Sequence, residues 1–209
     1  MNKPRAVIFD MGNVLIGWDP HEAYRHHLPD AGERLAFLAH YFRLMYDAVH
    51  DDPRPMSECL APLKEEYPEL RHLIEVYERQ WHLFLRGPIE ESVVLVDRLY
   101  ERGVPLYGLT NWPHQVWPPH DVAGIADPAA YGFLDKFQDI VVSGRERMRK
   151  PEPQIYDLAL LRFSLEPHEA VFVDDLPENV EAAKAHGLHG IHFTDAAALE
   201  AELVGFGLL

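Results

Sequence analysis

Short apolar segments alternate with longer amphipathic segments over most of the chain. The short segments are rich in β-branched and aromatic residues and end in polar or glycine-containing turns, a pattern that predicts buried strands. They are Ala6–Phe9, Val104–Leu109, Asp139–Val142, Ala170–Val173 and Gly190–Phe193. Between and after them, several of the longer segments begin with proline or are followed by glycine, which predicts helices. These helices are Ser92–Arg102, Pro153–Phe163, Pro177–His186 and Asp195–Val204. The alternation predicts an α/β fold with a doubly wound, Rossmann-like parallel sheet.

The stretch from about residue 20 to residue 86 departs from this alternation, because no strand pattern interrupts its helical periodicity. In its last predicted helix, six apolar residues share one face, namely Leu70, Leu73, Ile74, Tyr77, Trp81 and Leu85. We interpret Tyr77 and Trp81 as packing residues of that helix. Gly87-Pro88 marks the return to the α/β pattern. We therefore expect a core of residues 1–17 and 87–209, with a helical subdomain of residues 18–86 inserted after the first strand.

The charge balance restricts the classes of partner. The 209 residues include 19 Lys and Arg against 34 Asp and Glu, a formal net charge of −15. Nucleic acids and anionic membranes are polyanions that require clustered basic residues, so we expect neither as a partner. The first apolar run is too short for a signal peptide, and no stretch approaches the roughly 20 apolar residues of a membrane span. We expect a cytoplasmic protein, either a monomer or a homodimer, in which the single cysteine, Cys59, is a buried apolar residue.

Residues with chemical potential follow the predicted strands. Asp10 follows the first strand, Thr110-Asn111 the second, Arg145–Lys150 comes after the third, and Asp174-Asp175 follows the fourth. Reactive groups in open parallel sheets collect at the carboxyl ends of the strands, so we expect these residues around one crevice.

Each of these residues has a chemical role that its type permits. An aspartate such as Asp10 can attack phosphorus or carbon and form a covalent intermediate. Asp174 and Asp175, with Asp10 nearby, form the oxygen cluster that Mg²⁺ prefers. The Thr110 hydroxyl and a backbone N–H of the Thr110-Asn111 turn can bind an oxyanion. Lys150 would hold Asp10 ionised and balance negative charge during group transfer.

The segment Arg145–Lys150 contains four of the 19 basic residues, in a chain that is otherwise acidic. An anionic substrate requires such a local positive charge or a metal ion. For Arg145, Arg147 and Arg149, an ion-paired surface loop is an equally good interpretation.

This order of residues resembles the haloacid dehalogenase superfamily of hydrolases over essentially the whole chain. Phe9–Val14 matches the Phe-Asp-x-Gly-Asn-Val form of its phosphatase-like branch. The resemblance implies that Asp10 is the nucleophile, that Thr110 binds the transferring group and that Lys150 stabilises charge. It also implies that Asp10, Asp174, Asp175 and the carbonyl of Gly12 hold Mg²⁺. The insert resembles the superfamily's small helical cap, which closes over the crevice and helps select the substrate.

The implied activity is hydrolysis of a small phosphomonoester, a phosphorylated metabolite for which a sugar phosphate is the favoured example. We expect Asn111, Trp18 and Trp112 to contact the substrate together with Thr110. Other candidates for lining the pocket are Arg25, His26, His27 and Tyr46.

Gly12 departs from the family pattern. Phosphatases of the superfamily usually place a second aspartate at this position, which protonates the leaving group and later activates water. Such acid–base help contributes roughly 10²–10⁴-fold to the rate, so we expect weak activity on poor leaving groups. Asp19, His21 and His114 are the candidate substitutes.

Two alternatives remain open. A hydrolytic 2-haloacid dehalogenase would use Asp10 to attack carbon, although such enzymes need no metal and the acidic pair Asp174-Asp175 argues against this reading. A binding or regulatory protein without turnover is the other alternative, with Gly12 as the lesion. The retained residues at the strand ends argue against loss of activity.

Overall fold

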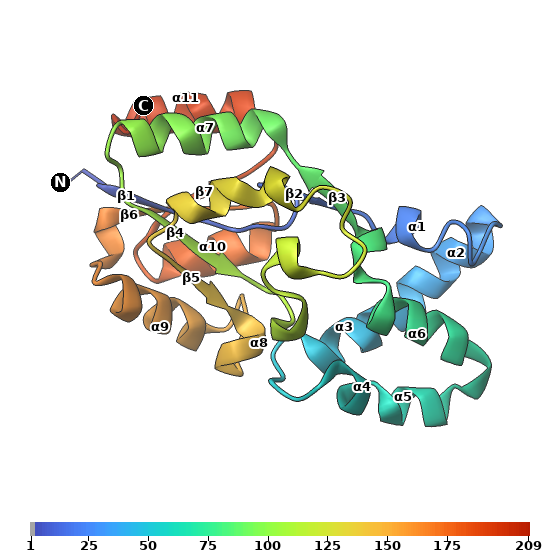
Figure 1. The fold of residues 1–209 in the computed structure, drawn as a ribbon. Helices are drawn as coiled ribbons and strands as arrows, with labels where there is room; N and C mark the ends of the chain where they lie inside the picture. The colour runs from blue at the N-terminus through green and yellow to red at the C-terminus, as the bar shows by residue number, and fades with distance from the viewer. Residues whose placement is uncertain (1–2) are drawn as a thin grey trace.

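The core of the protein is a five-stranded parallel sheet (Figure 1). The computed structural model describes residues 3–209. In spatial order the strands are β5 (Asp139–Val142), β4 (Leu106–Thr110), β1 (Ala6–Phe9), β6 (Ala170–Asp174) and β7 (His189–His192). Each neighbouring pair is parallel. The predicted α/β fold is confirmed, and observed strand ends differ from the predicted ones by two residues or fewer.

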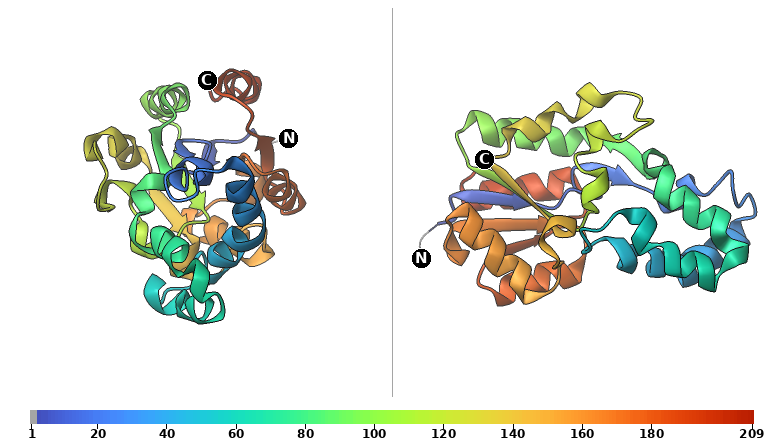
Figure 2. Two further views of the ribbon diagram at one scale, coloured as in Figure 1. Left: turned by 90° about the vertical axis from the view of Figure 1, so that its right-hand side faces the viewer. Right: turned by 60° about the horizontal axis from the view of Figure 1, so that its bottom comes forward.

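Helices cover both faces of the sheet, as the end-on view of Figure 2 shows. On one face lie α7 (Glu90–Glu101) and α11 (Ala196–Phe206), and on the other lie α9 (Pro153–Phe163) and α10 (Pro177–Ala185). Side chains alternate between the faces of a strand. Accordingly, Val7 and Phe9 belong to the first apolar cluster, whereas Ala6 and Ile8 belong to the second. Because both faces are buried, β1 is apolar throughout rather than alternating.

A second group of helices projects from the carboxyl end of the sheet, at the right of Figure 1. Its helices are α1 (Pro20–Ala23), α2 (Ala31–Phe37), α3 (Arg43–Val49), α4 (Met56–Cys59), α5 (Ala61–Glu66) and α6 (Arg71–Arg79). A π-helical turn, Leu38–Phe42, joins α2 to α3. We call residues 18–86 the cap. Cys59 is buried there, as expected.

The cap is not helical throughout, which corrects one expectation. The final predicted helix ends at Arg79, because Gln80 leaves the helical region with φ −122° and ψ 41°. A 3₁₀ turn, Trp81–Phe84, follows, and Leu85 begins a short strand. This strand, β3 (Leu85–Pro88), pairs antiparallel with β2 (Ile16–Trp18). The β2–β3 ribbon therefore connects the cap to the core at both of its ends.

The segment between β4 and β5 forms 3₁₀ turns at His114–Val116, Pro119–Asp121 and Pro128–Lys136. The last of these packs beside α7, where Lys136 pairs with Asp97 at 2.5 Å. A short helix, α8 (Ser143–Glu146), follows β5. Within residues 3–209, no helix combines the length and the apolar character required to cross a bilayer.

Candidate active site

Three charged side chains from three segments meet at the carboxyl end of the sheet. Lys150 Nζ lies 2.8 Å from Asp10 Oδ1 and 2.7 Å from Asp174 Oδ2, and it also donates to the carbonyl of Leu109 at 2.8 Å. Asp10 follows β1, Asp174 ends β6 and Lys150 lies in the loop after α8. The ammonium group therefore uses its three donors on two carboxylates and one carbonyl.

The carboxylate of Asp174 is completely engaged. Its Oδ1 accepts from the backbone N–H of Leu176 at 2.9 Å and from Asn179 Nδ2 at 2.9 Å. Its Oδ2 accepts from Lys150 at 2.7 Å and from Asn179 at 3.1 Å. Three donor groups, from Lys150, Leu176 and Asn179, therefore engage both oxygens of Asp174.

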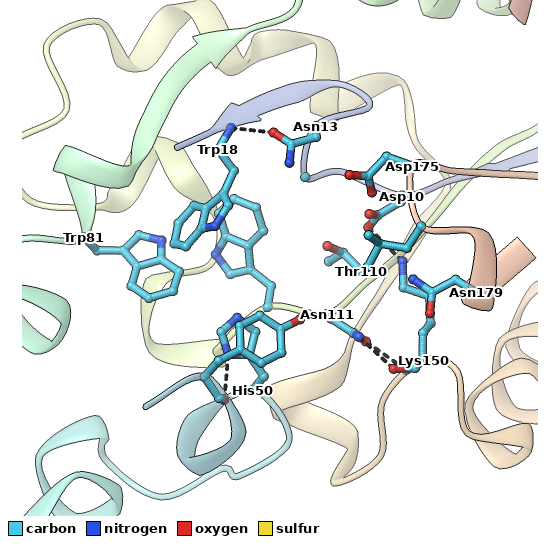
Figure 3. A pocket seen from close by; sticks show the side chains of 14 residues that line it. Asp10, Asn13, Trp18, His50, Trp81, Thr110, Asn111, Lys150, Asp175 and Asn179 are labelled. Atoms are coloured by element: carbon cyan, nitrogen blue, oxygen red, sulfur yellow. Dashed lines mark hydrogen bonds and ion pairs between the residues drawn. The ribbon is translucent and has the colours of Figure 1, made fainter. Parts of the chain in front are cut away.

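Asp175 is more accessible than its neighbour and lines the cavity in front of Asp10 (Figure 3). One ligand oxygen each from Asp10, Asp174 and Asp175 lies within 4.8 Å of the others. Hard oxygen donors at this spacing fit a small divalent cation whose remaining positions are filled by water and substrate. A Cβ built on Gly12 would meet no atom within 4 Å, so the side of the site next to Asp10 is open.

Burial dominates the acid–base properties of the site. Burial raises the pKa of Asp10 to about 7, against the opposing effect of Lys150, while Asp174 raises the pKa further. Burial would lower the pKa of Lys150, but the two carboxylates outweigh it and hold this pKa above its ordinary value. Burial and Asp174 also raise the pKa of Asp175. Lys150 is thus a permanent cation. Without its charge, the pKa of Asp10 would be higher than about 7.

Thr110 and Asn111 reach the site from the end of β4. Thr110 is buried and lines the cavity. Asn111 forms a paired contact with the backbone of Lys150: its Nδ2 donates to the carbonyl and its Oδ1 accepts from the N–H, each at 2.9 Å. Asn111 therefore fixes the loop that presents Lys150.

The cavity between cap and core has a volume of about 220 Å³. Its charged and polar wall is formed by the residues described above, and its opposite wall is aromatic (Figure 3). The lining residues are Asp10, Gly12, Asn13, Trp18, Tyr46, His50, Trp81, Thr110, Asn111, Trp112, Lys150, Asp175, Leu176 and Asn179.

Most of the residues predicted from the sequence come together here, including Trp18, Trp112 and Tyr46. Among the described residues 3–209, however, other candidates lie outside the cavity lining. Arg25, His26 and His27 are exposed on the cap. The three substitute acids are also absent from the lining: Asp19 caps α1 by accepting from the Glu22 N–H, and His21 and His114 lie elsewhere.

Only one residue of the basic segment Arg145–Lys150 enters the site. Arg145 and Arg147 are exposed. Arg149 points to the cap, where its Nη1 lies 2.7 Å from Asp47 Oδ1 and its Nε lies 3.7 Å from Asp51 Oδ2. The positive charge inside the site therefore comes from Lys150.

Sequence reasoning missed His50, Asn179 and the second role of Trp81. His50 is the C-cap of α3, and Asn179 lies in the first turn of α10, where it donates to Asp174. Asn179 stands five residues after Asp174, a spacing that places it near the strand end from which α10 begins. His50 has no local signal, since only the packing of the cap on the core brings it to the cavity.

The parallel sheet, with carboxylates and a lysine gathered at its carboxyl end, is consistent with a hydrolase. The haloacid dehalogenase-like hydrolase model matches residues 4–187, and the chain belongs to that family. The chain is 32% identical to the sesquiterpene phosphatase astK of Aspergillus oryzae over 95% of this chain and 94% of the relative. It is 38% identical to the phosphorylated carbohydrates phosphatase of Thermotoga maritima, over 90% of this chain and 83% of the relative.

Solved structures agree with this fold. A HAD-like family hydrolase from Porphyromonas gingivalis superposes with a TM-score of 0.74 at 20% identity, covering 97% of this chain and 98% of the other. A HAD family enzyme from Bacteroides thetaiotaomicron, in complex with magnesium and inorganic phosphate, gives a TM-score of 0.66 at 20% identity, covering 94% and 98% of the two chains.

Proposed function

We propose that the protein is a magnesium-dependent phosphatase that hydrolyses a small phosphomonoester through an aspartyl-phosphate on Asp10. The observation that carries this proposal is the position of Lys150, which bridges Asp10 and Asp174 beside the third carboxylate, Asp175. Two of the relatives that match over most of the chain are phosphatases by name, and this supports a phosphorylated small molecule as the substrate.

The donor set supports a cation at this site. Asp10, Asp175 and the carbonyl of Gly12 are the residues that would hold Mg²⁺. The sequence also placed Asp174 among the ligands; we propose instead that it lies beside them, because its oxygens accept from Lys150, Leu176 and Asn179. The structural neighbour that binds magnesium and phosphate has the same fold. Bound Mg²⁺ would neutralise part of the charge that the carboxylates and the substrate phosphate bring together.

The chain's own residues account for both chemical steps. An Asp10 oxygen attacks phosphorus, the bond from phosphorus to the ester oxygen breaks, and the ester oxygen leaves with the electron pair as an alkoxide or aryloxide. Water then attacks the aspartyl-phosphate, the bond from Asp10 to phosphorus breaks, and inorganic phosphate leaves. The attacking water loses one proton, which converts the alkoxide or aryloxide that left in the first step into the alcohol or phenol. The positive charge of Lys150 and the hydroxyl of Thr110 stabilise the phosphoryl oxygens in both steps.

The test is phosphate release from p-nitrophenyl phosphate by the native protein and by Asp10→Asn, each with Mg²⁺ or with a chelator. The aryl leaving group needs little protonation, so the missing acid at Gly12 does not mask activity. We expect release only when both Mg²⁺ and Asp10 are present. Circular dichroism establishes that both proteins are folded.

Two results would contradict the proposal. Halide release from a 2-haloacid without metal, with no phosphate release, would assign the chain to the dehalogenases. A folded protein that releases neither product would favour a binding or regulatory role.

A further inference from the structure

The wall that faces the three carboxylates is aromatic. Trp18, His50 and Trp81, labelled in Figure 3, form it together with Tyr46 and Trp112 of the cavity lining, and we call these five residues the aromatic wall. The ring centroids of Trp18 and Trp81 are 4.7 Å apart, and Trp112 lies 6.2 Å from Trp18 and 6.3 Å from Trp81. Tyr46 stacks on His50 with centroids 3.4 Å apart. The cap supplies part of this wall and the end of β4 supplies Trp112.

The aromatic wall carries no charge. Burial lowers the pKa of His50 to about 3, so its ring is neutral, and burial raises the pKa of Tyr46 to about 12, so its hydroxyl keeps its proton. The charged side chains of the cavity lining are Asp10, Lys150 and Asp175, and all three lie on the opposite side.

Two polar groups of the wall are already engaged. Trp112 Nε1 donates to the carbonyl of Val116 at 2.9 Å, and His50 Nδ1 donates to the carbonyl of Tyr46 at 2.9 Å. Trp81 Nε1 is a buried donor without a partner in residues 3–209. A polyol packed against the faces of these rings would give up hydrogen bonds to water there, because a ring face offers no comparable partner. An apolar ring would lose nothing of this kind, and it would gain edge-to-face contacts with the indoles.

We propose that the substrate's organic group is a flat, apolar ring or unsaturated group that packs against the aromatic wall, in place of the sugar favoured by the sequence. The inference rests on the proposed phosphatase function, since it places the phosphate at Asp10 and the ring against Trp18 and Trp81. The missing acid at Gly12 points the same way. An aryl oxyanion leaves without a proton donor far more easily than an alkoxide does.

The decisive measurement is calorimetric binding of phosphonates to the native protein with Mg²⁺. Phosphonates are used because they resemble phosphate esters and cannot be hydrolysed. The probes are benzylphosphonate, 2,3-dihydroxypropylphosphonate and methylphosphonate. We expect the Kd of benzylphosphonate to be at least tenfold lower than the other two. A Kd for the dihydroxypropyl compound equal to or below that of benzylphosphonate would overturn the inference. Tighter binding of 2-(trimethylammonio)ethylphosphonate would also overturn it, since aromatic walls bind such cations too.

Matched tryptophan variants locate the preference. Trp18→Leu removes a ring from the cavity, whereas Trp117→Leu removes a half-buried ring that packs behind Trp112 and outside the lining. We expect Trp18→Leu to reduce the preference for benzylphosphonate over methylphosphonate at least threefold and Trp117→Leu to preserve it. Tyr46→Leu serves the same purpose if Trp18→Leu does not fold. An equal loss in Trp117→Leu would contradict recognition by the wall.

Turnover of acetyl phosphate separates this inference from the proposed function. Acetyl phosphate is activated and carries no ring, so its hydrolysis depends on Asp10 and Mg²⁺ alone. Hydrolysis without a benzylphosphonate preference would overturn the inference and leave the phosphatase function standing. If benzylphosphonate binds preferentially but neither acetyl phosphate nor p-nitrophenyl phosphate is hydrolysed, the aromatic binding surface is established and the proposed phosphatase function is contradicted.

Discussion

Lys150 Nζ lies 2.7 Å from Asp174 Oδ2, and both side chains are shielded from solvent. Asp174 is fully occupied by this contact and by those from Leu176 and Asn179, whereas Asp175 faces the cavity. We therefore predict different roles for the two neighbouring carboxylates: Asp174 positions Lys150, and Asp175 binds the cation.

Asparagine substitutions distinguish these roles. We expect Asp175→Asn to weaken Mg²⁺ binding at least tenfold in a calorimetric titration, with little change in the free energy of unfolding. We expect Asp174→Asn to lower that free energy by about 3 kcal/mol, because a buried lysine loses a charged partner. Urea unfolding measures the second effect. Equal loss of Mg²⁺ binding with unchanged stability in Asp174→Asn would show that Asp174 is a direct ligand.

Restoring a carboxylate at Gly12 tests the missing acid. The position has space, since a Cβ there meets no atom within 4 Å and the backbone is not left-handed. We expect Gly12→Asp to raise kcat/KM for an alkyl phosphate roughly 100-fold, within the range of acid–base catalysis, and to change aryl phosphate turnover far less. Steady-state phosphate release measures both.

Gly12→Asn is the matched control, because it has the same shape without an ionisable group. An equal gain in Gly12→Asn would mean that the added side chain acts by packing or hydrogen bonding. No gain in Gly12→Asp, with Mg²⁺ binding intact, would mean that another group already supplies the proton.

The sheet and the charged half of the site were predictable because they depend on local pattern. Ala6–Phe9 is apolar throughout because β1 is buried on both faces, and parallel strands bring their carboxyl ends together. The difference between Asp174 and Asp175 was not visible, since adjacent residues of one type look equivalent in a sequence. It arises from the alternation of side chains at the end of β6, which turns only Asp174 inward.

The aromatic half of the site depends on tertiary packing. Helical periodicity placed Tyr77 and Trp81 on one face, and both are buried. Because the helix ends at Arg79, however, Trp81 belongs to a 3₁₀ turn and lines the cavity as well. His50 and Trp112 reach the same cavity from segments 62 residues apart in the sequence, and no local pattern encodes that meeting.

Burial of His50 predicts a loss of stability in mild acid. Its pKa falls from 6.5 to about 3 in the folded protein, mainly through burial, despite its hydrogen bond to the carbonyl of Tyr46. The unfolded chain therefore takes up a proton below pH 6.5 that the folded protein refuses. The contribution of His50 to stability is therefore complete above pH 6.5 and declines as the pH falls towards 3. At pH 5 this linkage costs about 2 kcal/mol.

Urea unfolding at pH 7 and pH 5 measures this loss. His50→Phe keeps a flat ring beside Tyr46 and removes the titrating group. We expect the decrease in unfolding free energy between the two pH values to be smaller in His50→Phe than in the native protein by about 2 kcal/mol. An identical decrease in both proteins would assign the acid sensitivity to other groups.

The ion pair between Arg149 and Asp47 joins the core loop to the cap, and we predict that it favours the closed cavity. Both side chains are partly exposed, so the contribution is small, about 1 kcal/mol. We expect Arg149→Met to raise KM about fivefold, with kcat nearly unchanged. We also expect 0.5 M NaCl to raise the KM of the native protein and to leave the KM of the variant unchanged. Arg162→Met is the control, since Arg162 forms partly exposed ion pairs with Asp139 and Glu146, neither of which belongs to the cap. If both variants raise KM equally, the effect comes from lost surface charge, and the Arg149–Asp47 pair does not hold the cap closed.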